Sequence, residues 1–365
     1  MPSELLFTSF ATSNLEPKNS FGAKWQRLLD NLDLETLAAD KRVAVKMHLG
    51  GGFGFSTIHP YIVRQLVAAL KQAKAKEVFV CDGPSAVRNA AARGYTPETI
   101  GCQLVPVAGT ADKYFYTKTI EPPYLSLSEV ELAGEIVDAD VLVDFSHIKG
   151  HGCCGFGGAS KNLSMGAVVG STRRKLHALE GGLVWDAERC SHCGSCVEHC
   201  PNHALSFDED GVFDVNYHTC KFCQHCILIC PAKAITMSGS GYVAFQEGMA
   251  RTTAEVLKTF APGSTLFISL IQNVTIFCDC WGMTTPSLIP DVGMLAGHDI
   301  VAIEKAALDL VRIENLIPGS LPPGFTLTGK GHLFEQIHGK DPYVIVEALA
   351  RLGCGAPDYV LKTVE

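Results

Sequence analysis

Residues 43–84 read VAVKMHLGGGFGFSTIHPYIVRQLVAALKQAKAKEVFVCDGP, and this stretch decides the fold class. It opens with the apolar run Val43–Met47, and a second apolar run, Glu77–Cys81, is followed by the turn signal Asp82-Gly83-Pro84. Between them, residues 61–73 place apolar side chains at the i, i+3, i+4 spacing of a helix. Strand, helix and strand at this spacing predict an α/β fold with right-handed crossovers.

The same alternation continues further along the chain. Residues 137–145 are apolar enough for a strand that is buried on both faces, and helices are expected over residues 302–311 and 343–352. A cysteine-rich segment interrupts the pattern. We therefore predict a parallel or mixed sheet in a Rossmann-like domain built from residues 1–182 and 241–365, with residues 183–240 inserted as a separate α+β module.

Composition narrows the class of protein. The chain has 365 residues, 47% of them hydrophobic and 19% charged, a balance that allows a substantial core. A formal net charge of −8 argues against a nucleic-acid partner. No segment reaches the roughly 18–20 apolar residues that span a bilayer, and the start, Met1-Pro2-Ser3-Glu4, lacks the basic region of a signal peptide. The expected location is the cytoplasm.

Eight of the fifteen cysteines lie between residues 190 and 230, in two copies of one pattern. The copies, offset by 30 residues, are Cys190-x-x-Cys193-x-x-Cys196-x-x-x-Cys200-Pro201 and Cys220-x-x-Cys223-x-x-Cys226-x-x-x-Cys230-Pro231. This repetition indicates an internal duplication. A secreted disulfide framework fits poorly because no signal peptide is expected. Zinc sites require neither the third cysteine at the same step nor the Cys-Pro ending.

The spacing is typical of two [4Fe–4S] clusters. Three cysteines, each separated from the next by two residues, direct three thiolates onto one cubane. The fourth cysteine, before the proline, reaches the other cluster. The predicted ligands are Cys190, Cys193, Cys196 and Cys230 for cluster 1 and Cys220, Cys223, Cys226 and Cys200 for cluster 2. The module resembles the bacterial two-cluster ferredoxins, which implies a role in electron transfer.

A second dense stretch, residues 147–162, follows directly from the apolar strand that ends at Phe145. In open α/β sheets, ligands bind beyond the carboxyl ends of the strands, and glycines let backbone N–H groups approach an anion. A glycine-rich connector with solvated cations is the alternative. We expect a site that takes an additional metal or an anionic ligand. Its candidate residues are Gly155, Gly157 and Gly158 as backbone contacts, and His147, Lys149, His151 and Lys161 as donors or a general base.

Motifs along nearly the whole chain resemble the family catalogued as domain of unknown function 362, which often carries a ferredoxin insert. Where that family has Asp-Pro followed by Asp, this chain has Asp299-Ile300 and Glu304, so the resemblance assigns no role to Glu304. The family is defined without a settled activity. The matching motifs are Val45-Lys46-Met47-His48, Val80-Cys81-Asp82-Gly83-Pro84, the stretch from His151 to Gly166, Cys278-Asp279-Cys280 and Pro290-Asp291-Val292-Gly293.

A shorter pattern, His151-x9-Lys161-x15-His177 with Gly-Phe-Gly-Gly before the lysine, resembles the core of the nickel-pincer lactate racemases. The resemblance implies that Lys161 tethers the cofactor, that His151 is a catalytic acid/base and that His177 is a metal ligand. It covers about 30 residues, and a shared fold alone is the alternative explanation.

The remaining cysteines leave several roles open. Cys278 and Cys280 would share one face if their segment is a strand, and two such thiols bind a metal, form a redox disulfide or pack as small apolar side chains. With Cys153 and Cys154 they would complete a further metal site near the glycine-rich turn.

Three functions follow from these patterns. The first is an iron–sulfur oxidoreductase, in which two clusters relay electrons to or from a site around His151 and Lys161 and exchange them with a redox partner protein or a small-molecule substrate. The second is a non-catalytic electron carrier or adaptor. The third is lactate-racemase-like, metal-dependent chemistry on a small acid. The first is slightly favoured, because the link from His177 to Cys190 is short enough to place the module against that site.

Overall fold

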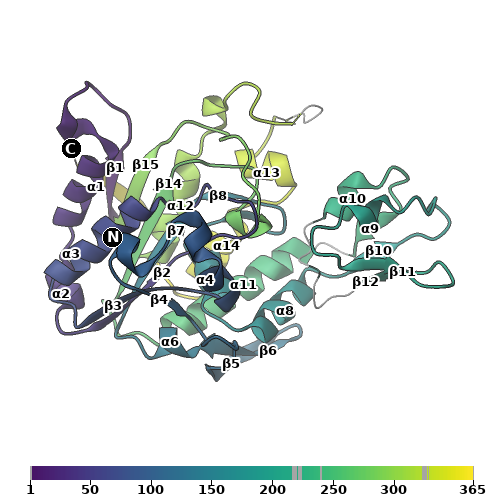
Figure 1. Ribbon diagram of the computed structural model, residues 1–365, viewed down its shortest axis with the longest axis horizontal. Helices are drawn as coiled ribbons and strands as arrows, with labels where there is room; N and C mark the ends of the chain where they lie inside the picture. Colours follow the sequence, from purple (N-terminus) through teal and green to yellow (C-terminus); the bar gives the residue numbers. More distant parts are fainter. Residues whose placement is uncertain are drawn as a thin grey trace.

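A computed structural model of the chain describes residues 2–215, 220, 224–238, 241–322, 327 and 329–364. The predicted ligand Cys223 lies outside the described residues. Figure 1 shows an α/β body and a smaller lobe that projects from it. No described helix is long and apolar enough to cross a membrane.

The described residues of the body form an eight-stranded mixed sheet. Neighbouring strands from β14 to β4 are parallel, whereas β15 runs antiparallel between β14 and β1. The predicted α/β class is therefore confirmed. The strands, in order across the sheet, are β16 (Tyr359–Thr363), β1 (Ser3–Ser9), β15 (Gly293–Gly297), β14 (Thr265–Ile271), β7 (Val141–His147), β2 (Arg42–Lys46), β3 (Glu77–Asp82) and β4 (Gln103–Pro106).

The strand–helix–strand prediction for residues 43–84 is confirmed by β2, α3 (Pro60–Gln72) and β3. The third predicted strand begins later than expected, because residues 134–137 form the short helix α6 (Gly134–Val137). Asp140 then fixes the start of β7, since its carboxylate accepts a hydrogen bond from the Arg42 backbone N–H at 2.8 Å. The polar residue Asp140 therefore separates α6 from β7, which the sequence pattern had joined into one predicted strand.

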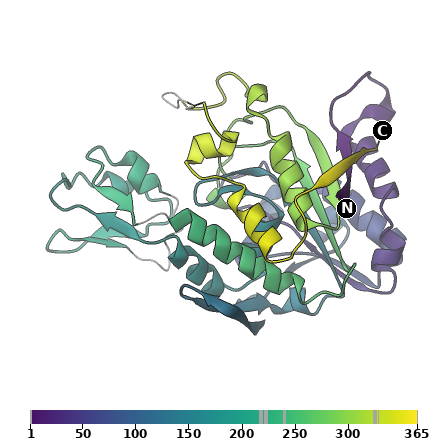
Figure 2. The same cartoon turned by 180° about the vertical axis from the view of Figure 1, so that it is seen from behind.

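Helices cover both faces of the sheet (Figures 1 and 2). Side chains of β7 alternate between two cores: Val143 packs with the helices on one face and Leu142 with those on the other. This two-sided burial explains why Val141, Leu142, Val143 and Phe145 of the strand are all apolar. One face carries α1 (Phe21–Asp30), α2 (Leu34–Ala38) and α3; the other carries α7 (Ala159–Gly166), α8 (Gly170–Leu179), α11 (Gly241–Leu257), α12 (Ile300–Leu310) and α14 (Val344–Arg351).

Shorter elements connect these layers. A hairpin of β5 (Phe115–Tyr124) and β6 (Leu127–Ala133) packs near α8 and α11, and a second hairpin of β8 (Lys149–His151) and β9 (Gly155–Gly157) follows β7. The others are α4 (Pro84–Arg88), α5 (Pro97–Ile100), α13 (Leu333–His338) and the 3₁₀ turns η1 (Pro17–Asn19), η2 (Ala90–Arg93), η3 (Asp279–Trp281) and η4 (Ile313–Asn315).

The lobe, which we define as residues 183–238, repeats its elements at the 30-residue offset of the cysteine pattern. Its strands are β10 (Leu183–Trp185), β11 (Leu205–Phe207), β12 (Phe213–Val215) and β13 (Ile235–Met237), and its helices are α9 (Ser195–Glu198) and α10 (His225–Ile229). The pairing is reciprocal: β10 of the first half pairs with β13 of the second, and β11 pairs with β12. The two halves are thus related by an approximate twofold arrangement.

Candidate functional site

The glycine-rich turn lies where β7 and its parallel neighbour β14 both end. Because parallel strands end at the same edge of the sheet, the loops that follow them are neighbours. Gly150 permits their contact, since a Cβ atom there would lie 2.2 Å from the Ile276 carbonyl oxygen. Gly157 is also close, since a Cβ atom on it would lie 3.7 Å from the Cys278 sulfur. The close approach at Gly150 therefore brings the segment that carries Cys278 and Cys280 against the turn.

The side chains that meet there form what we call the thiol–lysine cluster: Lys161, His151, Cys154, Cys278 and Cys280. Lys161 Nζ lies 3.8 Å from Cys278 Sγ and 3.7 Å from Cys280 Sγ. The ring of His151 lies between two thiols, with Nε2 3.5 Å from Cys280 Sγ and Nδ1 3.3 Å from Cys154 Sγ. The two residues that we predicted to be catalytic, His151 and Lys161, are therefore next to the same sulfur atom.

Charges in this cluster are set by burial and by the neighbouring sulfurs. A hydrogen bond from Cys280 outweighs burial, and with the Lys161 ammonium it lowers the pKa of Cys278 well below its ordinary value. Burial opposes the Lys161 charge, but Cys278 and Cys280 outweigh it and raise the pKa of Lys161. Burial, reinforced by the Lys161 charge, lowers the pKa of His151 well below its ordinary value. The cluster thus favours a thiolate, an ammonium and a neutral imidazole.

The hydrogen bonds of His151 fix its tautomer. Its Nδ1 accepts the Cys153 backbone N–H at 3.1 Å, so the neutral ring carries its proton on Nε2. The ring therefore donates toward Cys280, whose thiol donates in turn to Cys278. At the other end of this series of hydrogen bonds, the Lys161 ammonium donates to Cys278.

Lys149 and His147, which we predicted as donors, hold the neighbouring loop. Lys149 Nζ lies 2.8 Å from Asp279 Oδ1 and donates to the Ser56 carbonyl oxygen at 3.0 Å. His147 Nδ1 lies 3.6 Å from the other Asp279 oxygen. Lys149 and Asp279 are both buried, and the pKa of Asp279 is lowered despite that burial by His147 and Lys149. Because Asp279 stands between Cys278 and Cys280, this ion pair positions both thiols.

Cys278 and Cys280 are brought together by a turn rather than by the strand we considered. Cys278 is the residue before η3, and Cys280 lies inside it. The turn directs both sulfurs to Lys161. The physical reason is the buried Asp279 carboxylate, which draws the chain inward toward Lys149.

The start of α7 is occupied by a protein carboxylate. The Ala159 N–H donates to Glu304 Oε1 at 2.6 Å, and Ser160 Oγ donates to the other oxygen. A Cβ on Gly158 would lie 2.2 Å from Glu304 Oε1, so only glycine admits this contact. Gly155 has a φ of +79° and packs against the Lys340 carbonyl oxygen. The Ala159 N–H at this helix start is therefore already bonded to Glu304, whereas the backbone contacts expected from Gly155, Gly157 and Gly158 to a ligand stay a prediction.

In the lobe, the described cysteines gather around a small apolar core that includes Cys196, Cys200 and Cys226. Cys190 and Cys230 are close enough to Cys196 to help burial raise its pKa. The Cys200 and Cys230 sulfurs each accept a backbone N–H at 3.3 Å, from Ala204 and Ala234 respectively. The two Cys-Pro ends thus have matching environments, and the donor set fits soft metal ions such as iron in iron–sulfur centres.

The second half of the lobe contacts the body beside the thiol–lysine cluster. His225, the neighbour of Cys226, packs edge-on against Trp281 with 5.1 Å between ring centroids. Trp281 follows Cys280 in the chain and lies 6.3 Å from the His151 ring. Gln224 Nε2 also donates to the Gly152 carbonyl oxygen at 3.5 Å. A continuous set of ring contacts therefore joins the lobe to the cluster.

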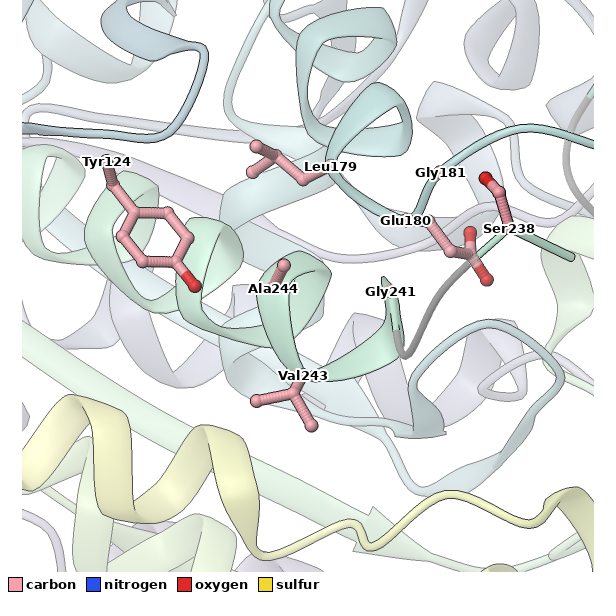
Figure 3. A pocket seen from close by; sticks show the side chains of 8 residues that line it. All are labelled: Tyr124, Leu179, Glu180, Gly181, Ser238, Gly241, Val243 and Ala244. Atoms are coloured by element: carbon pink, nitrogen blue, oxygen red, sulfur yellow. The ribbon is translucent and has the colours of Figure 1, made fainter.

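His177 belongs to a group with Cys153 and Glu180 that does not include Cys278 or Cys280. One ligand atom from each of the three lies within 4.8 Å of the others. Among the described residues, no other group of three or more metal-ligating side chains is that compact. Glu180 also lines an open pocket of about 350 Å³ between α8 and the start of α11 (Figure 3). This group is a candidate metal site.

Sequence reasoning missed Glu180, Glu304, Asp279 and Trp281 as members of these sites. Glu304 carried a signal, since a lone acid on the apolar face of the predicted helix over residues 302–311 is expected to have a buried partner. Trp281 and Asp279 carried no such signal in the sequence, because the partner of Trp281 comes from the lobe and the partner of Asp279 comes from β8.

Comparison with known proteins gives a family and distant structural likenesses. The model of the family described as "Domain of unknown function (DUF362)" matches residues 43–309. No curated protein matches the chain. Two similar solved structures are the lactate racemase apoprotein from Thermoanaerobacterium thermosaccharolyticum (14% identity, 73% of this chain and 50% of that chain, TM-score 0.35) and a protein from Thermotoga maritima (13% identity, 70% and 52%, TM-score 0.35). This chain thus spans about half the length of each.

Proposed function

The chain belongs to the family described as domain of unknown function 362, and we propose that it passes electrons between two [4Fe–4S] clusters in the lobe and the thiol–lysine cluster of the body. The observation that carries this proposal is the contact between His225 and Trp281. It joins a residue next to a predicted cluster ligand, Cys226, to a residue next to a buried thiol, Cys280. A docking module without redox chemistry in the body would not need this arrangement.

The lobe supplies the residues that would hold the clusters. Cluster 1 would be bound by Cys190, Cys193, Cys196 and Cys230, and cluster 2 by Cys220, Cys223, Cys226 and Cys200. The N–H donors on Cys200 and Cys230 support this assignment, because hydrogen bonds to ligating sulfurs tune iron–sulfur centres. When bound, such clusters supply single-electron transfer. We propose residues 183–240 as the module, inserted between body segments 1–182 and 241–365.

The body supplies a thiol pair that can store two electrons. Oxidation would join the Cys278 and Cys280 sulfurs in a disulfide, release two electrons to the clusters and release the Cys280 proton to solvent, to which Cys280 is partly exposed. Reduction by the clusters reverses each step. Lys161 stabilises the Cys278 thiolate that reduction produces, and the His151 Nε2–H donates to Cys280. A small-molecule substrate or a partner protein would then exchange electrons with the pair.

The proposal is tested by counting metals and electrons on protein purified without oxygen. We expect about eight irons and eight sulfides per chain. After the thiol pair has been oxidised with a disulfide reagent and the reagent removed, reductive titration should consume about two electrons for the clusters and about two more for the disulfide. The double variant Cys278→Ser/Cys280→Ser should lose the second pair of electrons and keep its iron. Cys102→Ser, a buried thiol in the other core, is the matched control and should behave as wild type.

Other outcomes favour the remaining functions. An unchanged electron count in the double variant, together with Lys161→Met exchanging electrons at the wild-type rate, would indicate a carrier or adaptor. Stoichiometric nickel beside the iron would support racemase-like chemistry, whereas zinc with little iron would contradict the clusters themselves.

A further inference from the structure

We infer that Cys153, His177 and Glu180 bind one divalent transition-metal ion of the zinc class, separately from the clusters proposed for the lobe. The three side chains come from different places: the β8–β9 turn, the last turn of α8 and the residue after that helix. One ligand atom from each lies within 4.8 Å of the other two. A tetrahedral ion with ligands at about 2.0–2.3 Å places its ligand atoms about 3.3–3.8 Å apart, so small side-chain adjustments close the site.

The state of Glu180 is the second, independent observation. The residue is only 2% exposed, yet neither carboxylate oxygen has a hydrogen-bond partner within the described part of the chain. The carboxylate faces the His177 ring, with Nδ1 3.7 Å from Oε2. A buried carboxylate without hydrogen bonds costs several kcal/mol. A cation bound between Glu180, His177 and Cys153 would offset that cost and would explain why an acid is placed there.

The donor atoms select the kind of ion. One thiolate, one imidazole and one carboxylate suit zinc and related borderline ions, whereas calcium and magnesium require oxygen ligands. Three protein ligands leave a fourth position for water or another ligand. The His177 ring is already oriented, because it stacks on Phe245 with 5.0 Å between centroids and an interplanar angle of 19°. Glu180 also lines the open pocket in Figure 3, which gives an ion a route from solvent.

The position of the site gives the ion a structural consequence. Leu183, three residues after Glu180, begins the first strand of the lobe. The returning chain crosses at Gly241, where a Cβ would lie 1.6 Å from the Glu180 carbonyl oxygen. On the other side, Cys153 adjoins Cys154 of the thiol–lysine cluster. A bound ion would therefore link the start of the lobe, at Leu183, to the glycine-rich turn that carries His151.

The experiment measures zinc, nickel, cobalt and iron on the full chain, purified without oxygen and then dialysed against Zn²⁺. We expect about one zinc per chain beside the iron. His177→Ala and the isosteric variants Glu180→Gln and Cys153→Ser should each lose it and keep their iron. The matched controls are His298→Ala, an exposed histidine, and Glu129→Gln, a half-exposed acid on β6; both should retain zinc.

X-ray absorption at the zinc edge tests the site without any substitution. The expected first shell holds one sulfur at about 2.3 Å and nitrogen or oxygen ligands at about 2.0–2.2 Å. Wild type that takes up no zinc, variants that keep their zinc, or a zinc bound by four sulfurs would each overturn the inference. Because the iron content and the electron count report on the lobe and the thiol pair, their failure would be recognised separately.

Discussion

Glu304 shows how one buried acid can complete the start of a helix. Its carboxylate receives the Ala159 N–H and the Ser160 hydroxyl at the first turn of α7, close to Lys161 on the same helix. Burial raises its pKa to about 7, although those hydrogen bonds act in the opposite direction. Near neutral pH, Glu304 is therefore close to its titration midpoint. Part of the free energy of unfolding should then depend on whether Glu304 is protonated.

The pH dependence of stability tests this state. Because the folded pKa lies above the ordinary value of 4.5, the folded protein binds the proton more tightly, and stability falls as pH rises from about 4.5 to about 7. Glu304→Gln should remove this loss. Its stability relative to wild type should rise by about 3 kcal/mol across that range, measured by melting at pH 5 and pH 8. A constant difference between Glu304→Gln and wild type across this pH range would contradict the shift.

Individual residues also show where sequence reasoning reaches its limit. Cysteines, Lys161 and His151 were identifiable because a turn rich in glycine, thiols and bases is unusual. Glu180 was not, since its role depends on side chains that the fold brings together from the β8–β9 turn and α8. The tautomer of His151 could not be predicted from the sequence either, because the backbone N–H of Cys153 decides which ring nitrogen carries the proton.

Among the elements, the loop around η3 depends most on a buried ion pair. Lys149 on β8 and Asp279 in η3 are each almost fully buried and 2.8 Å apart. Local sequence patterns placed β2, α3, β3, α12 and α14 correctly, because each carries its own apolar period. The η3 turn has no such period, and its shape is imposed by a partner on another strand.

Removing the lysine should therefore be costly. Lys149→Met leaves the Asp279 carboxylate buried with less compensation, so we expect a loss of about 3–5 kcal/mol in the free energy of unfolding, measured by chemical denaturation. Adding Asp279→Asn should restore part of it, since no charge is then left unpaired. Lys175→Met, which breaks the more exposed pair with Glu129, should cost less than about 1 kcal/mol. Equal losses for the two lysines would contradict the assignment.

At the scale of the whole molecule, the lobe and the body meet through aromatic rings. His225 packs on Trp281, and Trp281 stacks on Phe277 with 4.2 Å between centroids. Cys278 follows Phe277 in the chain and Cys280 precedes Trp281, so both thiols adjoin these rings. If electrons cross here, the junction rather than either part alone determines the rate.

Trp281→Leu should slow that exchange several-fold without changing the iron content. After the clusters are reduced by light in protein whose thiol pair is oxidised, visible absorbance should recover as electrons leave, more slowly in the variant. The final extent of recovery should match wild type, because the acceptor is intact. Tyr61→Leu, an exposed aromatic on α3, is the control. The same recovery rate in Trp281→Leu and wild type would exclude this route.

The reciprocal pairing of strands in the lobe has a consequence for the direction of the proposed electron transfer. Its two halves are alike in backbone: Gly194 and Gln224 share positive φ values of 73° and 64°, as His203 and Lys233 do at 48° and 50°. The second half, through Gln224 and His225, touches the body beside the thiols. If the lobe holds the two proposed clusters, its docking makes them unequal, with cluster 2 proximal to the body and cluster 1 distal. The distal cluster, whose proposed ligand Cys193 is exposed, would then be the one that exchanges electrons with an external redox partner.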